Sequence, residues 1–386
     1  MTISWPTEQI EKRQALLEAV HGTRSEIEAH FLESEDQGHL AQATADALLE
    51  AGLLGLKLPL ELGGAEADPV TQMKVIAEIA AIDTSAAWCT MVSATNVGSA
   101  GAFLPDRGID AVFDQGTHPM IVGVGMPFGE ANKTDDGFFE ISGKWPYGSG
   151  IKTSRWVTAG AKVKPAIQSD VPFEIRAILK TEQVQIIENW DVSGLRGSGS
   201  NDFFVEKAII PEYMTWAGDD TPNRGGFLYN IKRPAFVVFG HAGIALGTAK
   251  RALVEITHFS QTRSRNLPGQ SPISSNPIFQ ADIAQLDLKL RAMNALATEE
   301  FGEVWQYAQT GEKLSDKEQA KIRAIGSWVT KESLDIVTKS FQYAGGAALN
   351  KNNPLQQCFR DMYAASQHYM VSATHFESYG SEYFNT

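Results

Sequence analysis

The spacing of apolar residues changes twice along the 386-residue chain. Residues 8 to about 115 repeat apolar positions at helical spacing, residues from about 120 carry short or alternating apolar runs typical of strands, and helical spacing returns from Arg233 to the end. The pattern predicts an α+β fold with an N-terminal helical domain, a central antiparallel β-domain and a C-terminal four-helix bundle domain. The expected boundaries are 1–118, 119–222 and 223–386.

Capping residues mark the predicted helices of the N-terminal region. Thr7 is placed to cap a first helix, and a second helix near 40–51 stops at Gly52. The segment Asp83-Thr84-Ser85 caps a helix over 86–100, whose small and apolar residues must be buried nearly all round.

The central region reads as strands joined by turns. Its short strands are predicted at 121–124, 138–141, 156–161, 175–179 and 183–187. The stretch 190–211 follows, with three glycines in the seven residues from Gly194 to Ser200 and then a strand closed by Pro211. Taken alone, this stretch is a plain hairpin corner.

The C-terminal region predicts long helices. They cover 233–263, 277–309, a segment opened by the capping box of Ser315 and Glu318 and ended at Gly345-Gly346, and a last segment after Pro354. Apolar residues lie on more than one face of these helices, so the bundle is expected to pack against another subunit as a homo-oligomer.

Composition narrows the class of protein. Hydrophobic residues make up 43% and charged residues 20% of the chain, which is ordinary for a globular protein. A net charge of -13 argues against a nucleic acid or an anionic membrane as partner. Cys89 and Cys358 stand in apolar surroundings and predict core thiols in a reducing compartment. The longest apolar stretch, 234–247, is too short to span a bilayer, so we expect a cytoplasmic protein. No spacing of His, Glu or Cys predicts a metal site.

The order Trp-Asp, Gly-Leu-Arg-Gly-Ser-Gly-Ser, strand, Ile-Pro within 190–211 resembles the central β-domain motif of the acyl-CoA dehydrogenase superfamily. The N-terminal sequences Gly-Leu-Leu-Gly and Pro-Leu-Glu-Leu-Gly-Gly resemble its helical domain. Over nearly the whole chain the sequence is thus similar to a flavoprotein of this fold. The resemblance implies that Arg263 and Gln280 hold the diphosphate of FAD, that Gln342, Gly345 and Gly346 receive its adenosine part from a neighbouring subunit, and that the oligomer is a tetramer.

Both positions of the dehydrogenase base lack a carboxylate. Counting on from Arg360-Asp361 places Tyr369 where one branch of the family has its catalytic Glu, and counting back from Gly247 places Val237 and Val238 at the position used by the other. Dehydrogenases of this type remove a proton with a buried carboxylate. We therefore do not expect a conventional acyl-CoA dehydrogenase.

The run from Phe359 to His368 instead resembles the two-component, flavin-dependent monooxygenases of this fold, marked by Arg-Asp, a short helical run and His. The resemblance implies a separate NAD(P)H-dependent reductase that supplies reduced flavin, O₂ addition at C4a, and oxygen transfer from the hydroperoxide to an electron-rich substrate. His368 would then accept a substrate proton or hold a substrate heteroatom by hydrogen bond. The strand ending in Trp145-Pro146-Tyr147-Gly148-Ser149 implies that Ser149 hydrogen-bonds N5 of the flavin.

The predicted activity is oxygenation of an indole-like or phenolic small molecule, with FAD favoured over FMN. Five residues are candidates to line an aromatic-shaped pocket, although ordinary core positions are the simpler interpretation: Trp88, Asn96, Phe236, Phe239 and Tyr369. The alternatives are an N- or S-oxygenase of the same fold, a dehydrogenase with a displaced base, and a flavin-free binding or scaffold protein that would purify colourless.

Overall fold

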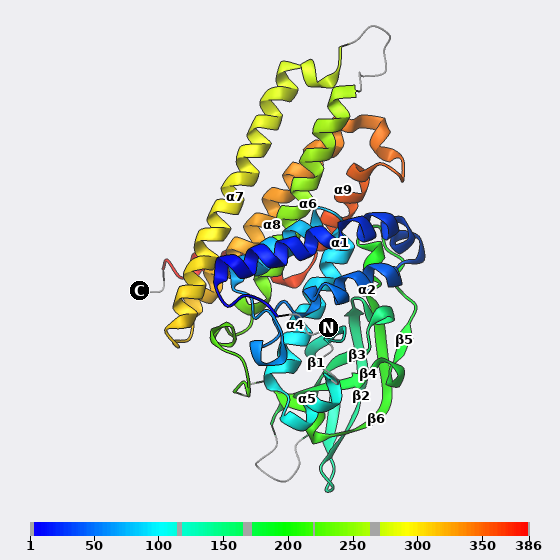
Figure 1. Ribbon diagram of the computed structural model, residues 1–386, viewed down its shortest axis with the longest axis vertical. Coiled ribbons are helices and arrows are strands. Elements are labelled where there is room, and N and C mark those ends of the chain that lie inside the picture. The colour runs from blue at the N-terminus through cyan, green and yellow to red at the C-terminus, as the bar shows by residue number, and fades with distance from the viewer. Residues whose placement is uncertain (1–3, 114–117, 165–171, 219–220, 263–270, 385–386) are drawn as a thin grey trace. The chain divides into compact units, whose positions relative to one another are not determined.

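The computed structural model describes residues 4–113, 118–164, 172–218, 221–262 and 271–384 (Figure 1). The chain divides into two compact units, each assembled from separate stretches of sequence. The first unit comprises 1–67, 88–191 and 196–229, and the second comprises 68–87, 192–195 and 230–386. The three domain boundaries expected from the sequence stay a prediction.

One sheet forms the centre of the first unit. Within the described residues its strand order is β5-β6-β2-β1-β3-β4-β7. The strands are β1 (Ile121–Lys133), β2 (Phe138–Gly148), β3 (Trp156–Val163), β4 (Glu174–Lys180), β5 (Gln185–Ile187), β6 (Asn201–Pro211) and β7 (Thr215–Ala217). A hairpin turn joins β1 to β2, as the sequence Asn-Lys-Thr-Asp-Asp-Gly predicts.

The prediction of a purely antiparallel sheet is wrong at one pair of strands. β1 and β3 run parallel, with Ile121 opposite Trp156 and Val122 opposite Val157, whereas the other pairs are antiparallel. The chain leaves β2, passes through the 3₁₀ turn Ile151–Thr153 and returns on the far side of β1. Apolar alternation predicts that a segment is a strand but not which strand lies beside it, so the sheet is mixed.

Helices of the first unit begin close to the predicted positions. They are α1 (Gln9–Gln37), α2 (Gln42–Glu50), most of α4 (Thr84–Phe103) and α5 (Asp106–Val112). The side chain of Glu8 caps α1 by accepting the N–H groups of Ile10 and Glu11, so the prediction of Thr7 as the cap is wrong by one residue. α2 ends before Gly52, which has the left-handed conformation that the sequence predicts.

α4 supplies the core that covers the sheet. Val97 of α4 and Leu104, just after the helix, pack in one buried cluster with Ile121, Trp156 and Ile178 of the strands. Nearly every residue of the helix is buried, as its small and apolar composition predicts. The helix is therefore a rigid support for residues that project from it toward the strands.

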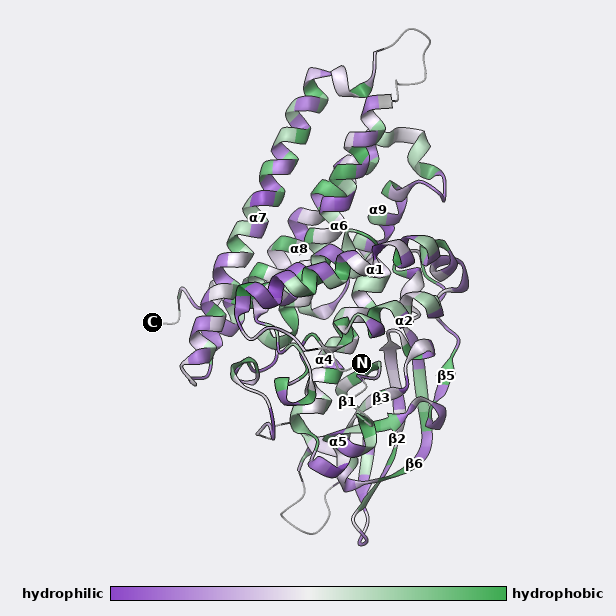
Figure 2. Cartoon of the chain, in the orientation of Figure 1, coloured by the Kyte–Doolittle hydropathy of each residue, from purple (hydrophilic) through white to green (hydrophobic). Residues whose placement is uncertain are grey.

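Long helices make up most of the second unit. They are α6 (Ala235–Thr262), α7 (Pro277–Gln309) and α8 (Asp316–Ala344), with the shorter α3 (Pro69–Ala80), α9 (Pro354–Ala365) and α10 (Thr374–Ser381). α7 carries hydrophilic and hydrophobic residues in alternating bands (Figure 2). The Ser315 and Glu318 side chains form the predicted capping box of α8.

The last predicted helix of the bundle is interrupted. α9 ends at Ala365, a 3₁₀ turn (Tyr369–Val371) follows, and α10 begins at Thr374. The side chain of His368 caps this 3₁₀ turn, and the backbone of His368 is extended. The prediction of one continuous fourth helix is therefore wrong. Because the chain leaves α9 before His368, the imidazole lies on a turn and is exposed to solvent.

Candidate active site

A chain of buried hydroxyls surrounds Ser149 in the first unit. The indole Nε1–H of Trp88 donates a hydrogen bond of 3.1 Å to Ser149 Oγ. Ser149 Oγ shares a second bond of 2.7 Å with Ser200 Oγ, and Ser200 shares a third of 2.7 Å with Ser198 Oγ. All four side chains are buried. Their arrangement holds the Ser149 hydroxyl at a fixed position just beyond the end of β2.

A tight turn brings these residues together. Ser149 lies between two residues with positive φ angles, Tyr147 at 62° and Gly150 at 80°. The N–H of Gly150 donates to the Ser198 carbonyl at 2.8 Å. The sequence prediction included Trp88 and Ser149 but missed Ser198 and Ser200. The only signal for them was the alternation of Gly and Ser in the motif that follows Leu195.

His368 has a defined orientation in the second unit. Its Nδ1 accepts the backbone N–H of Met370 at 3.2 Å. Its ring stacks on the ring of His241 from α6, with centroids 4.4 Å apart and planes tilted by 30°. Desolvation by the surrounding protein lowers the pKa of His368 to about 4. The exposure of the side chain limits the size of this shift, but its direction makes the imidazole neutral at pH 7. His241 was not predicted as a site residue, since 127 positions separate the two histidines.

Arg360 and Asp361, before His368, form hydrogen bonds to the glycine-rich turn at 193–195. Asp361 is fully buried, and its Oδ1 accepts the Leu195 N–H at 2.7 Å. Arg360 donates to the Ser193 carbonyl. A Cβ at Gly194 would lie 2.0 Å from the Arg360 carbonyl oxygen, so glycine is required there. Leu195 has a φ of 52°, which is uncommon for a residue with a side chain. The pair therefore supports the backbone of 193–195.

The five predicted pocket residues have different surroundings. Besides Trp88, Asn96 is buried in the first unit and its Nδ2 donates to the Val92 carbonyl of the same helix. Phe236 and Phe239 are buried on α6, and Phe239 packs edge-on against Phe301 with ring centroids 4.8 Å apart. Tyr369 is 69% exposed and its ring lies against His375. The structure thus brings Trp88 to Ser149, while Phe239 has the neighbours of an ordinary core residue.

The four predicted FAD residues that the structure describes at helices α7 and α8 lie at helix ends. Gln342, Gly345 and Gly346 are exposed at the end of α8, and open space surrounds both glycines. Gln280, in the first turn of α7, donates to the Ser274 carbonyl at 2.8 Å. Arg263 lies outside the described residues. An exposed turn with two glycines, beside the exposed side-chain amide of Gln342, suits a cofactor phosphate or ribose. These residues therefore fit the adenosine and phosphate parts of FAD.

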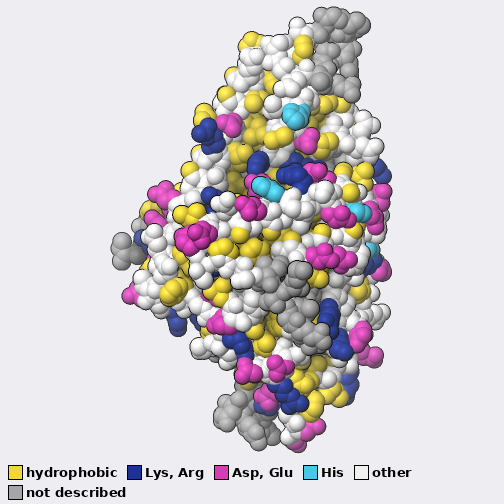
Figure 3. Space-filling model, in the orientation of Figure 1, with side chains coloured by type: hydrophobic (Ala, Val, Ile, Leu, Met, Phe, Trp, Pro, Cys, Tyr) yellow, Lys and Arg dark blue, Asp and Glu magenta, His cyan; other side chains and the backbone are white. Residues whose placement is uncertain are grey.

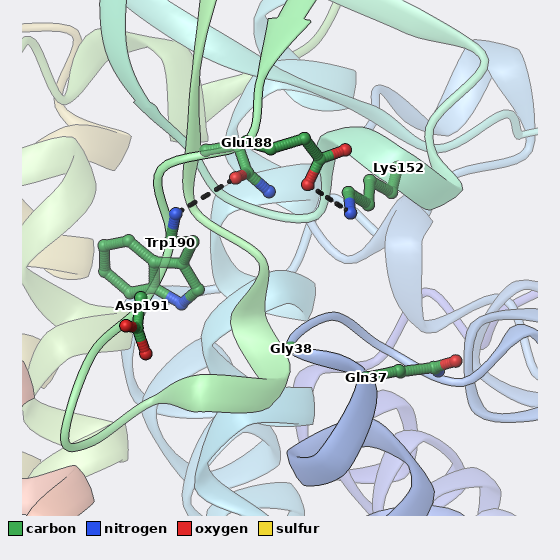
Figure 4. A pocket seen from close by; sticks show the side chains of 7 residues that line it. Gln37, Gly38, Lys152, Glu188, Trp190 and Asp191 are labelled. Atoms are coloured by element: carbon green, nitrogen blue, oxygen red, sulfur yellow. Dashed lines mark hydrogen bonds and ion pairs between the residues drawn. The ribbon is translucent and has the colours of Figure 1, made fainter.

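A cavity of about 130 Å³ lies elsewhere in the first unit (Figure 4). Its lining is Gln37, Gly38, Lys152, Glu188, Trp190, Asp191 and Asn201. Lys152 and Glu188 form an ion pair of 2.6 Å, and Asn201 Oδ1 accepts the N–H of Trp190. The cavity is polar and smaller than pockets that enclose drug-sized molecules. None of the predicted site residues lines it, so we do not assign it to the substrate.

Four properties of the described residues bear on whether the protein could bind a metal ion, cross a membrane, carry a one-signed surface or use a reactive thiol. They include no group of three or more His, Cys, Asp or Glu side chains that could hold a metal ion. None of the described helices has the length and apolarity needed to cross a membrane. On the face in Figure 3, Lys and Arg side chains are interspersed with Asp and Glu. Both cysteines are buried free thiols, and burial raises the pKa of Cys358 to about 12, so this thiol is unreactive.

Comparisons with known proteins agree with this architecture. The family model "Acyl-CoA dehydrogenase, N-terminal domain" matches residues 10–103, and "Acyl-CoA dehydrogenase, C-terminal domain" matches residues 239–373. The structure of XiaF from Streptomyces in complex with FADH₂ and glycerol superposes with a TM-score of 0.89 at 22% identity, covering 98% of this chain and 97% of that one. The chain therefore belongs to the acyl-CoA dehydrogenase fold family.

Curated relatives define the branch of that family. The indole-3-acetate monooxygenase of Pseudomonas putida is 24% identical over 371 residues, which is 96% of this chain and 92% of the relative. The oxygenase subunit HsaA of a flavin-dependent monooxygenase from Mycobacterium tuberculosis is 23% identical over 372 residues, covering 92% and 91%. Within the fold family, this chain is a flavin-dependent monooxygenase.

Proposed function

We propose that the chain is the oxygenase component of a two-component monooxygenase that uses reduced flavin and O₂ to oxygenate a small aromatic molecule, indole-like or phenolic. A separate NAD(P)H-dependent reductase supplies the flavin. The observation that carries the proposal is the chemistry of the two base positions: Tyr369, Val237 and Val238 cannot remove a substrate proton as a carboxylate does, whereas the neighbouring His368 is a neutral imidazole.

The residues of the first unit suit the flavin side of this reaction. Reduced flavin, when bound, would supply the two electrons that activate O₂, and O₂ would supply the oxygen atom that is transferred to the substrate. Ser149 provides a neutral hydroxyl for N5, and the donor Trp88 and the acceptor or donor Ser200 fix that hydroxyl in place. Their burial excludes water from the hydroxyl chain, which favours product over hydrogen peroxide.

The second unit supplies the remaining proposed contacts. Gln280, Gln342, Gly345 and Gly346, with Arg263, hold the diphosphate and adenosine parts, which favours FAD over FMN. The adenosine contacts come from a neighbouring subunit of a homotetramer. Phe236 and Tyr369 of the second unit are proposed to contact the aromatic substrate.

The decisive test is anaerobic mixing of the protein with FADH₂ or FMNH₂, followed by oxygen and an aromatic probe, indole-3-acetate or phenol. We expect oxygenated product in proportion to the flavin oxidised, and less product with His368→Ala although the oligomer is intact. Oxidation at the rate of free flavin, with no product, would refute the proposal. Oxidised flavin that stays bound and is reduced by an acyl-CoA would establish the dehydrogenase instead.

A further inference from the structure

We propose that Met126 is a reversible oxidation site of the folded protein, at which hydrogen peroxide converts the thioether of the side chain to a sulfoxide. The inference goes beyond the proposed function and does not rest on it, because peroxide can be added from outside. It has a bearing on that function, since reduced flavin and O₂ form hydrogen peroxide whenever the oxygen atom does not reach a substrate.

Exposure sets Met126 apart from the other sulfur-containing side chains. Met126 is 61% exposed, whereas the other methionines that the structure describes are at most 8% exposed. These buried methionines are Met73, Met91, Met120, Met214, Met293, Met362 and Met370. Cys89 and Cys358 are fully buried, and Met1 lies outside the described residues. Within the part of the chain that the structure describes, peroxide therefore meets a single sulfur atom at the surface.

An irregularity in β1 projects Met126 from the sheet. β1 pairs with β3 on either side of this residue, at Val124 and at Gly129, so the four residues 125–128 of β1 pass the single residue Gly160 of β3. A Cβ at Gly160 would lie 2.4 Å from the Met126 carbonyl oxygen, so the backbone of the bulge lies close against this glycine. Bulges of this kind redirect side chains, and the thioether of Met126 is left in solvent.

The oxidation of Met126 needs no reactant besides peroxide. The sulfur lone pair attacks one peroxide oxygen, and the O–O bond breaks. The oxygen now bound to sulfur gives its proton to the departing hydroxide, which leaves as water. Sulfur loses two electrons and the peroxide gains them, so the products are methionine sulfoxide and water.

Buried sulfur atoms are protected because the protein must open before peroxide reaches them. The Sδ of Met120 accepts a hydrogen bond of 3.5 Å from the Thr153 hydroxyl, and the Sδ of Met293 faces the Ser333 hydroxyl at 3.9 Å. Burial raises the pKa of the Cys358 thiol to about 12, which leaves almost no thiolate at pH 7. Opening of core elements costs a large part of the free energy of unfolding, so these sulfur atoms react slowly in the folded protein.

Peroxide treatment followed by mass spectrometry tests the inference. Met120 and Met126 lie in the same tryptic peptide, 108–133, so fragment spectra compare a buried with an exposed methionine in one molecule. At pH 7 we expect Met126 of the folded protein to gain an oxygen atom at least about tenfold faster than Met120. In protein unfolded by guanidinium the two rates should be equal. Equal rates in the folded protein, or faster oxidation of Met120, would overturn the inference.

Met126→Leu and Met120→Leu form a matched pair of variants. Peptide 108–133 from Met126→Leu should stay unoxidised under conditions in which the same peptide from Met120→Leu gains one oxygen atom. Because Met126 is exposed, Met126→Leu and the protein oxidised at Met126 should both keep the unfolding midpoint of the unchanged protein. A lower midpoint after oxidation at Met126 alone would show that this side chain is buried in solution, and the inference would fail.

Methionine sulfoxide reductases test whether the site is reversible. Two such enzymes act on the two epimers of the sulfoxide, and an exposed side chain lets them act on the folded protein. We expect a mixture of both to remove the added oxygen atom from the folded protein. Repair of the digested peptide but not of the folded protein would refute a reversible site. None of these experiments measures oxygenation of an aromatic molecule, so failure of the proposed function would leave their outcome unchanged.

Discussion

Close contact between α3 and α6 makes Gly247 sensitive to the addition of a single methyl group. A Cβ at Gly247 would lie 2.1 Å from the Ala77 carbonyl oxygen and 2.7 Å from the Ala80 Cβ. Gly302, on α7, is the matched control because an added Cβ there meets no atom within 4 Å. Both glycines are in helix interiors, so both substitutions gain the same intrinsic helix propensity of about 1 kcal/mol.

The expected effects on unfolding have opposite signs. Gly302→Ala should raise the free energy of unfolding by about 0.5–1 kcal/mol. In Gly247→Ala the backbone of α3 must move by roughly an ångström, and overpacking of this kind costs about 1–3 kcal/mol. Because the atom in the way is a backbone oxygen that cannot rotate aside, we expect the upper end of that range. Gly247→Ala should therefore be less stable than Gly302→Ala by about 3 kcal/mol.

Guanidinium unfolding followed by circular dichroism measures the difference between the two variants. Equal slopes with different midpoints would show that stability, and not the unfolded state, has changed. Gly247→Ala with a midpoint equal to or above that of Gly302→Ala would refute the reasoning, because it would mean that α3 and α6 do not approach each other at this glycine.

Three further substitutions test other contacts. Trp88→Phe removes the donor to Ser149, so we expect the free energy of unfolding to fall by about 1 kcal/mol. We also expect more hydrogen peroxide per flavin oxidised. An unchanged ratio of peroxide to product would show that this hydrogen bond does not affect catalysis. Asp361→Ala leaves the buried Leu195 N–H without its acceptor and should cost about 1–3 kcal/mol, with Asp361→Asn milder because its oxygen can still accept; equal midpoints for the two variants would contradict this. Burial lowers the pKa of His118 below its usual 6.5. The contribution of this buried neutral imidazole to the free energy of unfolding is therefore complete above that pH and is lost as the pH falls below it. The unfolding midpoints at about pH 7 and 5 should differ less in His118→Asn than in the unchanged protein.

Much of the fold follows from local sequence signals. The glycine after α2, the Ser315 capping box and the apolar composition of α4 each act within a few residues, so the sequence predicts these elements closely. The parallel pairing of β1 with β3 is different, because it depends on which strand edge the chain reaches after β2. The break before His368 escaped prediction for a related reason: no proline or glycine marks it, and the histidine side chain itself supplies the cap.

In the candidate site, too, the sequence predicted what short motifs mark and missed what only tertiary folding brings together. Ser149 and His368 were predicted from short motifs around them, and their roles stay proposals. Their neighbours were not predicted, since Ser200 and His241 become neighbours only through tertiary folding. Phe239 shows how an aromatic residue on a helix leaves two interpretations open, a pocket wall and an ordinary core position, of which the core was the simpler. Its spacing suits a pocket, yet its ring is fully buried against Phe301.

The interleaving of the two units has a consequence for synthesis of the protein. The first unit is complete once residue 229 has been made, but the second draws on residues 68–87 and also needs the helices from 230 onward. Leu195 meets its acceptor Asp361 across 166 positions of sequence. On the ribosome, α3 must therefore wait for α6 (Ala235–Thr262), and the turn at 192–195 must wait for α9 (Pro354–Ala365). The apolar face of α3 stays open to chaperones until α6 has been made, and the turn gains its buried acceptor only near the end of translation.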